Sequence, residues 1–326
     1  MKAVLMTGGG ADSGNVGSMQ TSVARRLAEL VDGIDRVIVG KRAQIEDCVA
    51  CLLAGGHLLI EDLPGVGKTT LAHALAVCLG LRFSRVQFTA DLMPSDLLGV
   101  SVYERSREAF VFHPGPVFAQ VLLADEINRA GPKTQSALLE AMEEQQVSLD
   151  NQTYALPRPF FVIATQNPTE QLGTYPLPES QLDRFLMRIT LGYPDRAAER
   201  ALLAGVDRRE LITGLQPVMQ PAELEQAQAA ARAVRVSEPL LDYLQTLIAA
   251  TRSGQWFVDG LSPRAGIAVL RAAKARALMA QRDYVAPDDV QAILPQTIAH
   301  RLQPVPGGGR GAIEQVRALI EATPIP

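Results

Sequence analysis

The chain has 326 residues, of which 47% are hydrophobic and 20% charged, a balance typical of a folded globular protein with room for two domains. Its net charge of −4 argues against a protein that binds nucleic acid or an acidic membrane through bulk electrostatics. No stretch reaches the ~20 consecutive apolar residues of a membrane span, and the N-terminus lacks the apolar run of a signal peptide, so we expect a cytoplasmic protein without a membrane span.

The chain begins with a Gly- and Ser-containing stretch, and residues 1–18 are predicted to be a flexible leader. The segment "KRAQIEDCVACLLAGG" (41–56) then has the apolar spacing of a helix. Cys48 and Cys51 form a C-x-x-C pair on this helix, but no second pair follows. We therefore interpret them as buried thiols rather than as half of a metal site.

Short apolar runs alternate with helical segments over the next part of the chain. The runs occupy residues 57–61, 83–88, 121–125, 159–167 and 185–191, and the third is nearly all apolar, as a strand covered on both faces is. This alternation predicts an α/β core, residues 19–192, with a parallel five-stranded sheet and helices on both of its faces.

Two stretches do not belong to this minimal sheet. Residues 97–116 have apolar-rich arms around the charged turn 104–108, and residues 145–157 turn at Asp150–Asn151. Both are predicted to be hairpins that project from the core. From residue 193 to 326 the composition changes to Ala, Leu, Gln and Arg, which predicts a smaller all-helical domain with a last helix at 312–322.

The stretch "EDLPGVGKTTLA" after the first run nearly matches the phosphate-loop pattern G-x-x-x-x-G-K-[ST]. Asp62 stands where the pattern has its first glycine, far from the γ-phosphate, so binding need not be lost. Lys68 would reach the β- and γ-phosphates, and Thr69 would bind Mg²⁺. The expected nucleotide contacts are the loop residues Pro64, Gly65, Val66, Gly67, Lys68, Thr69 and Thr70. The alternative is an ordinary strand–turn–helix.

Two adjacent acids, Asp125 and Glu126, end the third run. Asp125 would bind Mg²⁺, and Glu126 would accept a proton from the water that attacks the γ-phosphate. A helix cap would need only one acid. Asn167 ends the fourth run, and its amide would orient that water if this strand lies beside the phosphate-loop strand.

Three arginines are candidates for contact with phosphate. Arg184 lies just before the fifth run, and Arg188 is a second candidate within it. Arg264 lies in "LSPRAG", where Ser262 suits an N-cap and Pro263 the first helical position. A cation in a first helical turn is disfavoured by the helix dipole, which points to a bound anion.

These motifs, in this order, resemble those of the AAA+ ATPases, which have a P-loop NTPase core and a helical lid. Among these ATPases the chain is most similar to the MoxR family, over about residues 21–301. The stretches that carry this resemblance are "EDLPGVGKTTLA", "FHPGPVF", "LLADEINRAGPKTQSALLEAMEEQQV", "ATQNPTEQLGTYPLPESQLDRF" and "SPRAG".

The resemblance implies an ATPase that uses ATP and Mg²⁺. It implies Walker A at Lys68 and Thr69, Walker B at Asp125 and Glu126, sensor one at Asn167, sensor two at Arg264, which would contact the bound nucleotide from the lid, an arginine finger for the neighbouring subunit at Arg184, and adenine contacts from Val37, Ile38 and Val39. It also implies a homo-oligomeric ring, commonly a hexamer, that remodels, matures or activates client protein complexes, often proteins with a von Willebrand factor A domain.

Two other functions use the same loop. Related AAA+ branches are nucleic-acid motors or loaders, but the charges of the first hairpin roughly cancel and the second has no lysine or arginine, so nucleic acid is an unlikely partner. A small-molecule kinase would not need Glu126 beside Asp125.

Overall fold

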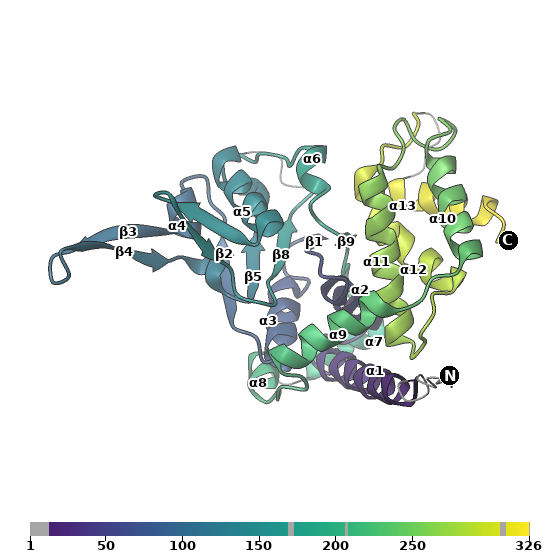
Figure 1. Cartoon of the computed structure of the whole chain (residues 1–326), viewed down its shortest axis with the longest axis horizontal. Coiled ribbons are helices and arrows are strands. Elements are labelled where there is room, and N and C mark those ends of the chain that lie inside the picture. The colour runs from purple at the N-terminus through teal and green to yellow at the C-terminus, as the bar shows by residue number, and fades with distance from the viewer. Residues whose placement is uncertain (1–12, 169–172, 206–207, 307–310, 326) are drawn as a thin grey trace, which may run out of the picture.

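The computed structural model describes residues 13–168, 173–205, 208–306 and 311–325, and it describes the side chains of these residues from 21 onward except 208 and 209. The chain forms a layered α/β core and a helical domain beside it, with a long hairpin that projects from the core (Figure 1).

The main sheet has five strands in the order β2-β5-β8-β1-β9, and every pair of neighbours is parallel. This confirms the predicted sheet. The strands are β1 Leu58–Glu61, β2 Phe83–Gln87, β5 Val121–Asp125, β8 Phe161–Gln166 and β9 Met187–Ile189. Because β8 lies between β5 and β1, the phosphate-loop strand and the strand of the two acids are separated by one strand.

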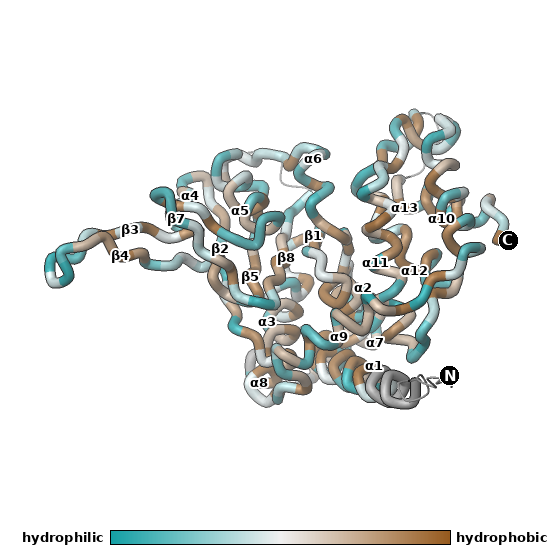
Figure 2. The backbone as a smooth tube through the Cα atoms, viewed as in Figure 1, coloured by the Kyte–Doolittle hydropathy of each residue, from teal (hydrophilic) through white to brown (hydrophobic). Residues whose placement is uncertain are grey.

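Alternate residues of each strand face opposite layers of the core. Leu58 and Ile60 of β1 pack into the layer of α1 (Ser13–Asp35), α2 (Arg42–Leu53) and α3 (Lys68–Cys78), whereas Leu59 faces the layer of α4 (Pro94–Leu98) and α5 (Pro132–Glu144). The strands β1, β5 and β8, which are brown over most of their length in Figure 2, are therefore buried on both sides.

Two antiparallel hairpins extend from the second layer. One is β3 (Gly99–Glu104) with β4 (Ala109–Pro114), and the other is β6 (Gln146–Leu149) with β7 (Gln152–Ala155). The two hairpins contact each other where the ring of Phe112 in β4 stacks on the ring of Tyr154 in β7, with ring centroids 4.0 Å apart. The first hairpin reaches far from the body, as Figure 1 shows.

The helical domain follows β9 and packs on the first layer through α9 and α11, which contact α2. Its helices are α7 Arg196–Ala204, α8 Arg208–Thr213, α9 Pro221–Ala233, α10 Glu238–Thr251, α11 Pro263–Met279, α12 Pro287–Ile298 and α13 Ala312–Ala322. The short helices are α6 Glu179–Leu182 and the 3-10 turns η1 Pro116–Phe118, η2 Ile127–Arg129 and η3 Ala299–Arg301.

The start of the chain differs from the expectation of an 18-residue leader. Residues 1–12 lie outside the described residues, but α1 begins at Ser13, so residues 13–18 are helical. Within the described part of the chain, no helix combines the length and the apolar character needed to cross a lipid bilayer.

Candidate active site

The phosphate loop connects β1 to α3 at the carboxyl edge of the sheet. Gly65 and Gly67 have φ angles of +82° and +97°, which glycine adopts without strain. A Cβ atom at either position would meet nothing within 4 Å, so the backbone conformation, and not crowding, explains the glycines. Lys68 Nζ donates to the carbonyl oxygens of Asp62 at 2.6 Å and Leu63 at 3.1 Å.

Asp62, the departure from the loop pattern, is 5% exposed and connects the loop to the end of β9. Its Oδ1 accepts the Leu63 N–H at 2.8 Å, and its Oδ2 accepts the Gly192 N–H at 2.6 Å. Gly192 has a φ of +65° and lies where the chain leaves the core for the helical domain. Asp62 therefore joins the phosphate loop to this connection.

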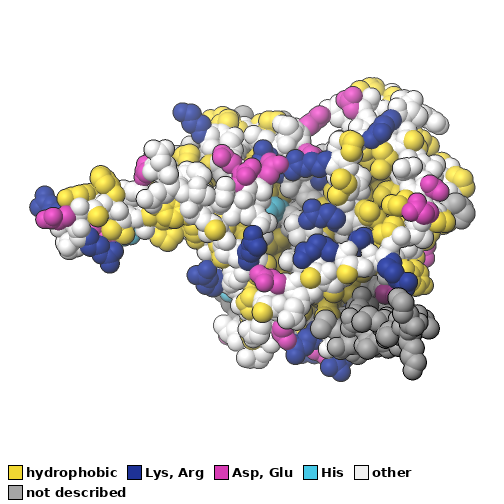
Figure 3. Space-filling view, in the orientation of Figure 1, with side chains coloured by type: hydrophobic (Ala, Val, Ile, Leu, Met, Phe, Trp, Pro, Cys, Tyr) yellow, Lys and Arg dark blue, Asp and Glu magenta, His cyan; other side chains and the backbone are white. Residues whose placement is uncertain are grey.

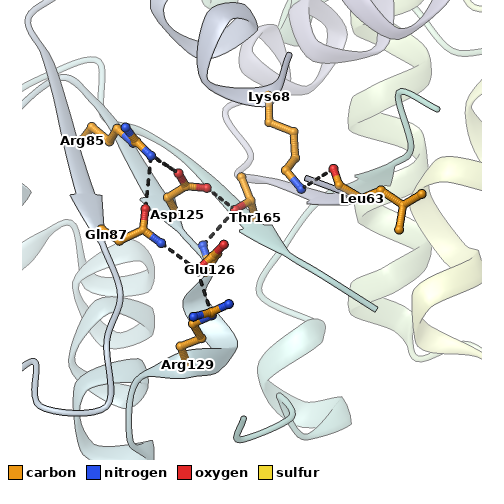
Figure 4. Close-up of polar contacts among 8 residues, drawn as sticks. All are labelled: Leu63, Lys68, Arg85, Gln87, Asp125, Glu126, Arg129 and Thr165. Carbon is orange, nitrogen blue, oxygen red and sulfur yellow. Dashed lines mark hydrogen bonds and ion pairs between the residues drawn. The ribbon is translucent and has the colours of Figure 1, made fainter. Parts of the chain in front are cut away.

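Asp125 ends β5 and is 7% exposed. Its Oδ2 accepts from Arg85 of β2 at 2.6 Å, and its Oδ1 accepts the Thr165 hydroxyl of β8 at 2.6 Å. Thr165 therefore lies between the strand of the acids and the phosphate-loop strand, with Lys68 beyond it (Figure 4).

Glu126 has a left-handed backbone, with φ +56° and ψ +49°, a conformation that costs a non-glycine residue about 1–3 kcal/mol. Its N–H donates to Thr165 Oγ1 at 2.9 Å. Its Oε2 accepts from Gln87 Nε2 at 2.7 Å and pairs with Arg129 Nε at 2.8 Å. The strained turn and these partners fix the carboxylate beside Asp125, as Figure 4 shows.

Asn167 follows β8 and is 6% exposed. The carbonyl of the preceding Gln166 accepts the Asp62 N–H at 3.1 Å, so the backbone of this segment lies against the start of the phosphate loop. The pairing of β8 with β1 thus brings Asn167 to the edge where the sequence pattern predicted it.

The donor set at this edge fits a nucleoside triphosphate with Mg²⁺. The loop has two glycines in left-handed conformation before a helix N-terminus, the arrangement that backbone N–H groups need to surround phosphate oxygens. No group of three or more His, Cys, Asp or Glu side chains among the described residues forms a metal cage.

The stretch predicted to contact adenine lies beside the connection to the helical domain. Val37 and Ile38 are buried, with exposed fractions of 2% and 7%. A Cβ at Gly40 would come within 2.9 Å of Ala198 Cβ in α7, and Lys41 Nζ donates to the Tyr193 carbonyl at 2.7 Å. The 36–40 turn therefore packs against the first turn of the helical domain.

The three arginines lie at different places. Arg188 of β9 donates to Glu61 Oε2 at 2.9 Å, so it is paired within the sheet next to its own phosphate loop. Arg184 precedes β9, at the amino edge of the sheet, where it pairs with Glu143 and donates to the Leu139 carbonyl at 2.9 Å.

Arg264 is not beside Lys68. Ser262 caps α11 as predicted, and Arg264 pairs with Glu143 at 3.2 Å and with Asp183 at 3.7 Å. It therefore lies near Arg184 at the amino edge, and the two carboxylates compensate a cation in the first helical turn without a bound anion.

A cavity of about 420 Å³ opens at this amino edge between the core and the helical domain. Its charged lining comprises Arg184, Arg264, Arg271, Arg301, Glu143 and Asp183. Figure 3 shows the corresponding gathering of Lys and Arg side chains between the two domains. Buried His57 also lines the cavity, and burial lowers its pKa to about 4.

Sequence reasoning missed four side chains of these two edges: Arg85, Gln87, Thr165 and Arg301. Arg85 and Gln87 alternate near the end of β2, but only the pairing of β2 with β5, which the sequence does not reveal, places them beside Asp125. Nothing local to the sequence marks Arg301, because its partners lie more than 100 positions away.

Comparison with known protein families gives two matches. The family model described as the ATPase family associated with various cellular activities (AAA) matches residues 57–187. A model of the AAA lid domain matches residues 249–321.

The chain is also similar to named proteins over most of its length. It is 42% identical to chaperone MoxR1 of Mycobacterium tuberculosis, over 85% of this chain and 75% of that protein. It is 34% identical to protein MoxR of Methylorubrum extorquens, over 90% and 93% of the two chains. A crystal structure of a protein from Cytophaga hutchinsonii, assigned as an ATPase, superimposes with a TM-score of 0.87 at 34% identity, covering 97% of this chain and all of that one.

Proposed function

Because the chain belongs to the MoxR family of AAA+ ATPases, we propose that it hydrolyses ATP to ADP and phosphate and uses the energy to remodel partner proteins. The observation that carries the proposal is the convergence of Lys68, Asp125 and Glu126 at one edge of the sheet, with Thr165 between their strands.

Hydrolysis follows from the groups at this edge. With ATP bound, Lys68 exchanges the loop carbonyls for the β- and γ-phosphate oxygens. Glu126 accepts the proton of the attacking water, and Asn167 orients that water. Mg²⁺, held by Thr69 and Asp125, would neutralise phosphate charge, and Arg85 would then give up its contact with Asp125.

A ring of identical subunits, commonly six, completes the site. Arg184 and Arg264 lie at the edge of the sheet opposite their own phosphate loop, so neither side chain is placed to reach its own γ-phosphate. In our proposal both are presented to the ATP of the adjoining subunit. An arginine supplied in this way is worth roughly 10³–10⁵ in rate.

The remodelling role is supported by the name of the M. tuberculosis relative, a chaperone. The β3–β4 hairpin offers a means of contact with a client, because its tip carries exposed apolar side chains such as Phe110, 74% exposed, and Tyr103, 52% exposed. The client class that we propose to test first is a protein with a von Willebrand factor A domain. We propose that the chain acts on its client in the cytoplasm.

The test of hydrolysis is Glu126→Gln. The variant should bind ATP with Mg²⁺ as the parent does, whereas phosphate release should fall on the order of 10²–10⁴-fold, because the general base is lost. Normal turnover in this variant would remove Glu126 from the mechanism.

The test of remodelling uses the same variant. Held with ATP, Glu126→Gln should retain a client domain in a pull-down, and Lys68→Ala, which does not hold ATP, is the matched control. Equal capture by the two variants would show that client binding is independent of nucleotide.

A further inference from the structure

Three side chains of the helical domain converge on the residues on either side of Arg184. Arg301 Nη2 donates to the Phe185 carbonyl at 2.7 Å and to the Asp183 carbonyl at 3.2 Å. His300 Nε2 lies 3.1 Å from the same Phe185 oxygen. Arg264 completes the set through its ion pair with the Asp183 carboxylate.

Arg301 is largely buried, since its side chain is only 6% exposed. Its Nε lies 3.1 Å from Asp183 Oδ1 in an ion pair, and its buried Nη1 has no hydrogen-bond partner among the described residues. Burying a guanidinium with one donor unpaired lowers the stability of the fold. The burial of Arg301 against Asp183 and Phe185 therefore requires an explanation other than stability.

These contacts leave Arg184 itself free to point elsewhere. Arg301 holds the backbone before and after Arg184, whereas the Arg184 side chain is directed to Glu143 and the Leu139 carbonyl of α5. The helical domain therefore grips the segment that carries the arginine and not the guanidinium. Arg301 therefore fixes the backbone from which the Arg184 side chain extends, but Arg301 does not itself contact the group that Arg184 acts on.

We propose that Arg301 is a positioning residue for Arg184: it fixes the segment just before β9 to the helical domain, so that Arg184 moves with that domain. The proposal rests on the function proposed above, in which Arg184 acts on the ATP of the adjoining subunit.

The arrangement gives each subunit a path from its own phosphate loop to its neighbour's site. The Asp62 carboxylate accepts the Gly192 N–H, where the chain leaves the core, so a change in the loop acts on the connection to the helical domain. The helical domain in turn holds Asp183 and Phe185 through Arg301. Loop, connection, helical domain and Arg184 thus form one mechanical series within a single chain.

The experiment compares Arg301→Ala and Arg301→Lys with Arg184→Ala. Arg301→Ala should bind ATP normally, because the phosphate loop is untouched, while maximal phosphate release falls on the order of 10²-fold, the effect of a misplacement of about 1 Å. Arg301→Lys keeps a charge and one donor toward the carbonyls, and should restore part of the turnover.

Mixed rings separate positioning from a general loss of structure. Lys68→Ala subunits have no working phosphate loop of their own but an intact Arg184. Mixing them with Arg301→Ala subunits should raise phosphate release above the sum of the two proteins alone, because each intact loop can then meet a correctly placed arginine. Arg252→Ala is the matched control, since Arg252 also donates to a carbonyl, that of Leu261, but does so within the helical domain, and its turnover should stay at the parent level.

The possible outcomes distinguish this inference from the proposed function. The proposed function stands if Arg184→Ala lowers turnover and mixing rescues it. The inference about Arg301 is then wrong in either of two cases: Arg301→Ala retains full turnover, or Arg301→Ala binds ATP normally but is not rescued by mixing. If the parent protein releases no phosphate, or Arg184→Ala has parental turnover, the proposed function itself fails.

Discussion

The two edges of the central sheet carry opposite kinds of site. At the carboxyl edge the acids Asp125 and Glu126 are matched by Arg85 and Arg129, so the charges balance within the core. At the amino edge the cavity is lined by four arginines but only two carboxylates. In our proposal the carboxyl edge exchanges its internal partners for ATP, whereas the described residues of the amino-edge cavity include more arginines than carboxylates.

The surplus has a physical consequence. Cations gathered in a cavity raise one another's free energy, and an anion from outside lowers it. In the ring that we propose, the triphosphate of an adjoining subunit has that charge. Each subunit is thus expected to contribute a different half of two sites, and the predictions below test that division.

The largest effects should come from removing the cation of each edge. Lys68→Ala should lose ATP binding itself, measured by calorimetry with Mg²⁺, because the Lys68 ammonium, which donates to loop carbonyls here, is the cation expected to meet the β- and γ-phosphates. Arg184→Ala should keep that binding but lose turnover on the order of 10³-fold or more at saturating ATP. Loss of ATP binding in Arg184→Ala would place both cations at one site and abolish the comparison.

The next effect concerns acid stability, which should be a property of the amino edge. Burial lowers the pKa of His57 to about 4, and it also lowers the pKa of His300 well below its ordinary value. His57 is neutral in the fold: Nδ1 accepts the Val162 N–H at 3.0 Å, and Nε2 faces the Met142 carbonyl at 3.2 Å.

The direction in which stability changes with pH follows from whether the folded or the unfolded chain takes up the proton. Above about pH 6.5 neither the folded nor the unfolded chain protonates His57, and its contribution to stability is complete. As the pH falls toward 4, the unfolded chain takes up a proton that the fold excludes, so the free energy of unfolding decreases by up to about 3 kcal/mol.

The measurement is the urea midpoint at several pH values for the parent and for His57→Gln, whose amide can serve both partners without titrating. The variant should lose less stability between pH 6.5 and 4. Burial raises the pKa of Asp47 to about 7, so the contribution of Asp47 to stability increases as the pH falls, opposite to that of His57. Only the difference between the two proteins therefore isolates His57. Identical pH profiles would remove His57 from acid denaturation.

The carboxyl edge was largely predictable from sequence because its groups lie next to strand ends. A parallel sheet brings the carboxyl ends of its strands to one edge, so Lys68, Asp125 and Asn167 could be grouped before the structure was known. The fold itself was predictable because the strands that are buried on both faces, β1, β5 and β8, are mostly apolar. The partners that hold Asp125 and Glu126 depend on which strands are neighbours, and β2 beside β5 was not evident.

The amino edge was much less predictable. Arg264 obeyed its local signals, with Ser262 as the cap, yet its position across from Asp183 depends on how the helical domain packs on the core. Arg301 had no local signal at all, because its role arises from a contact between residues 116 positions apart. Periodicity and motifs describe one element at a time, whereas this edge is made by two domains.

The smallest effect should come from Gln87, which holds Glu126 from β2. Gln87→Leu removes a donor to a carboxylate, a hydrogen bond worth about 1.5–3 kcal/mol, but Arg129 remains as a partner. We expect Glu126 to become more available to water and basal phosphate release to rise by less than about 10-fold. Gln166→Leu is the matched control, because Gln166 donates to Glu61 at another strand end, and its turnover should change less. A fall in turnover for Gln87→Leu alone would mean that Gln87 orients Glu126 for catalysis, so that the carboxyl edge is already set for chemistry before ATP arrives.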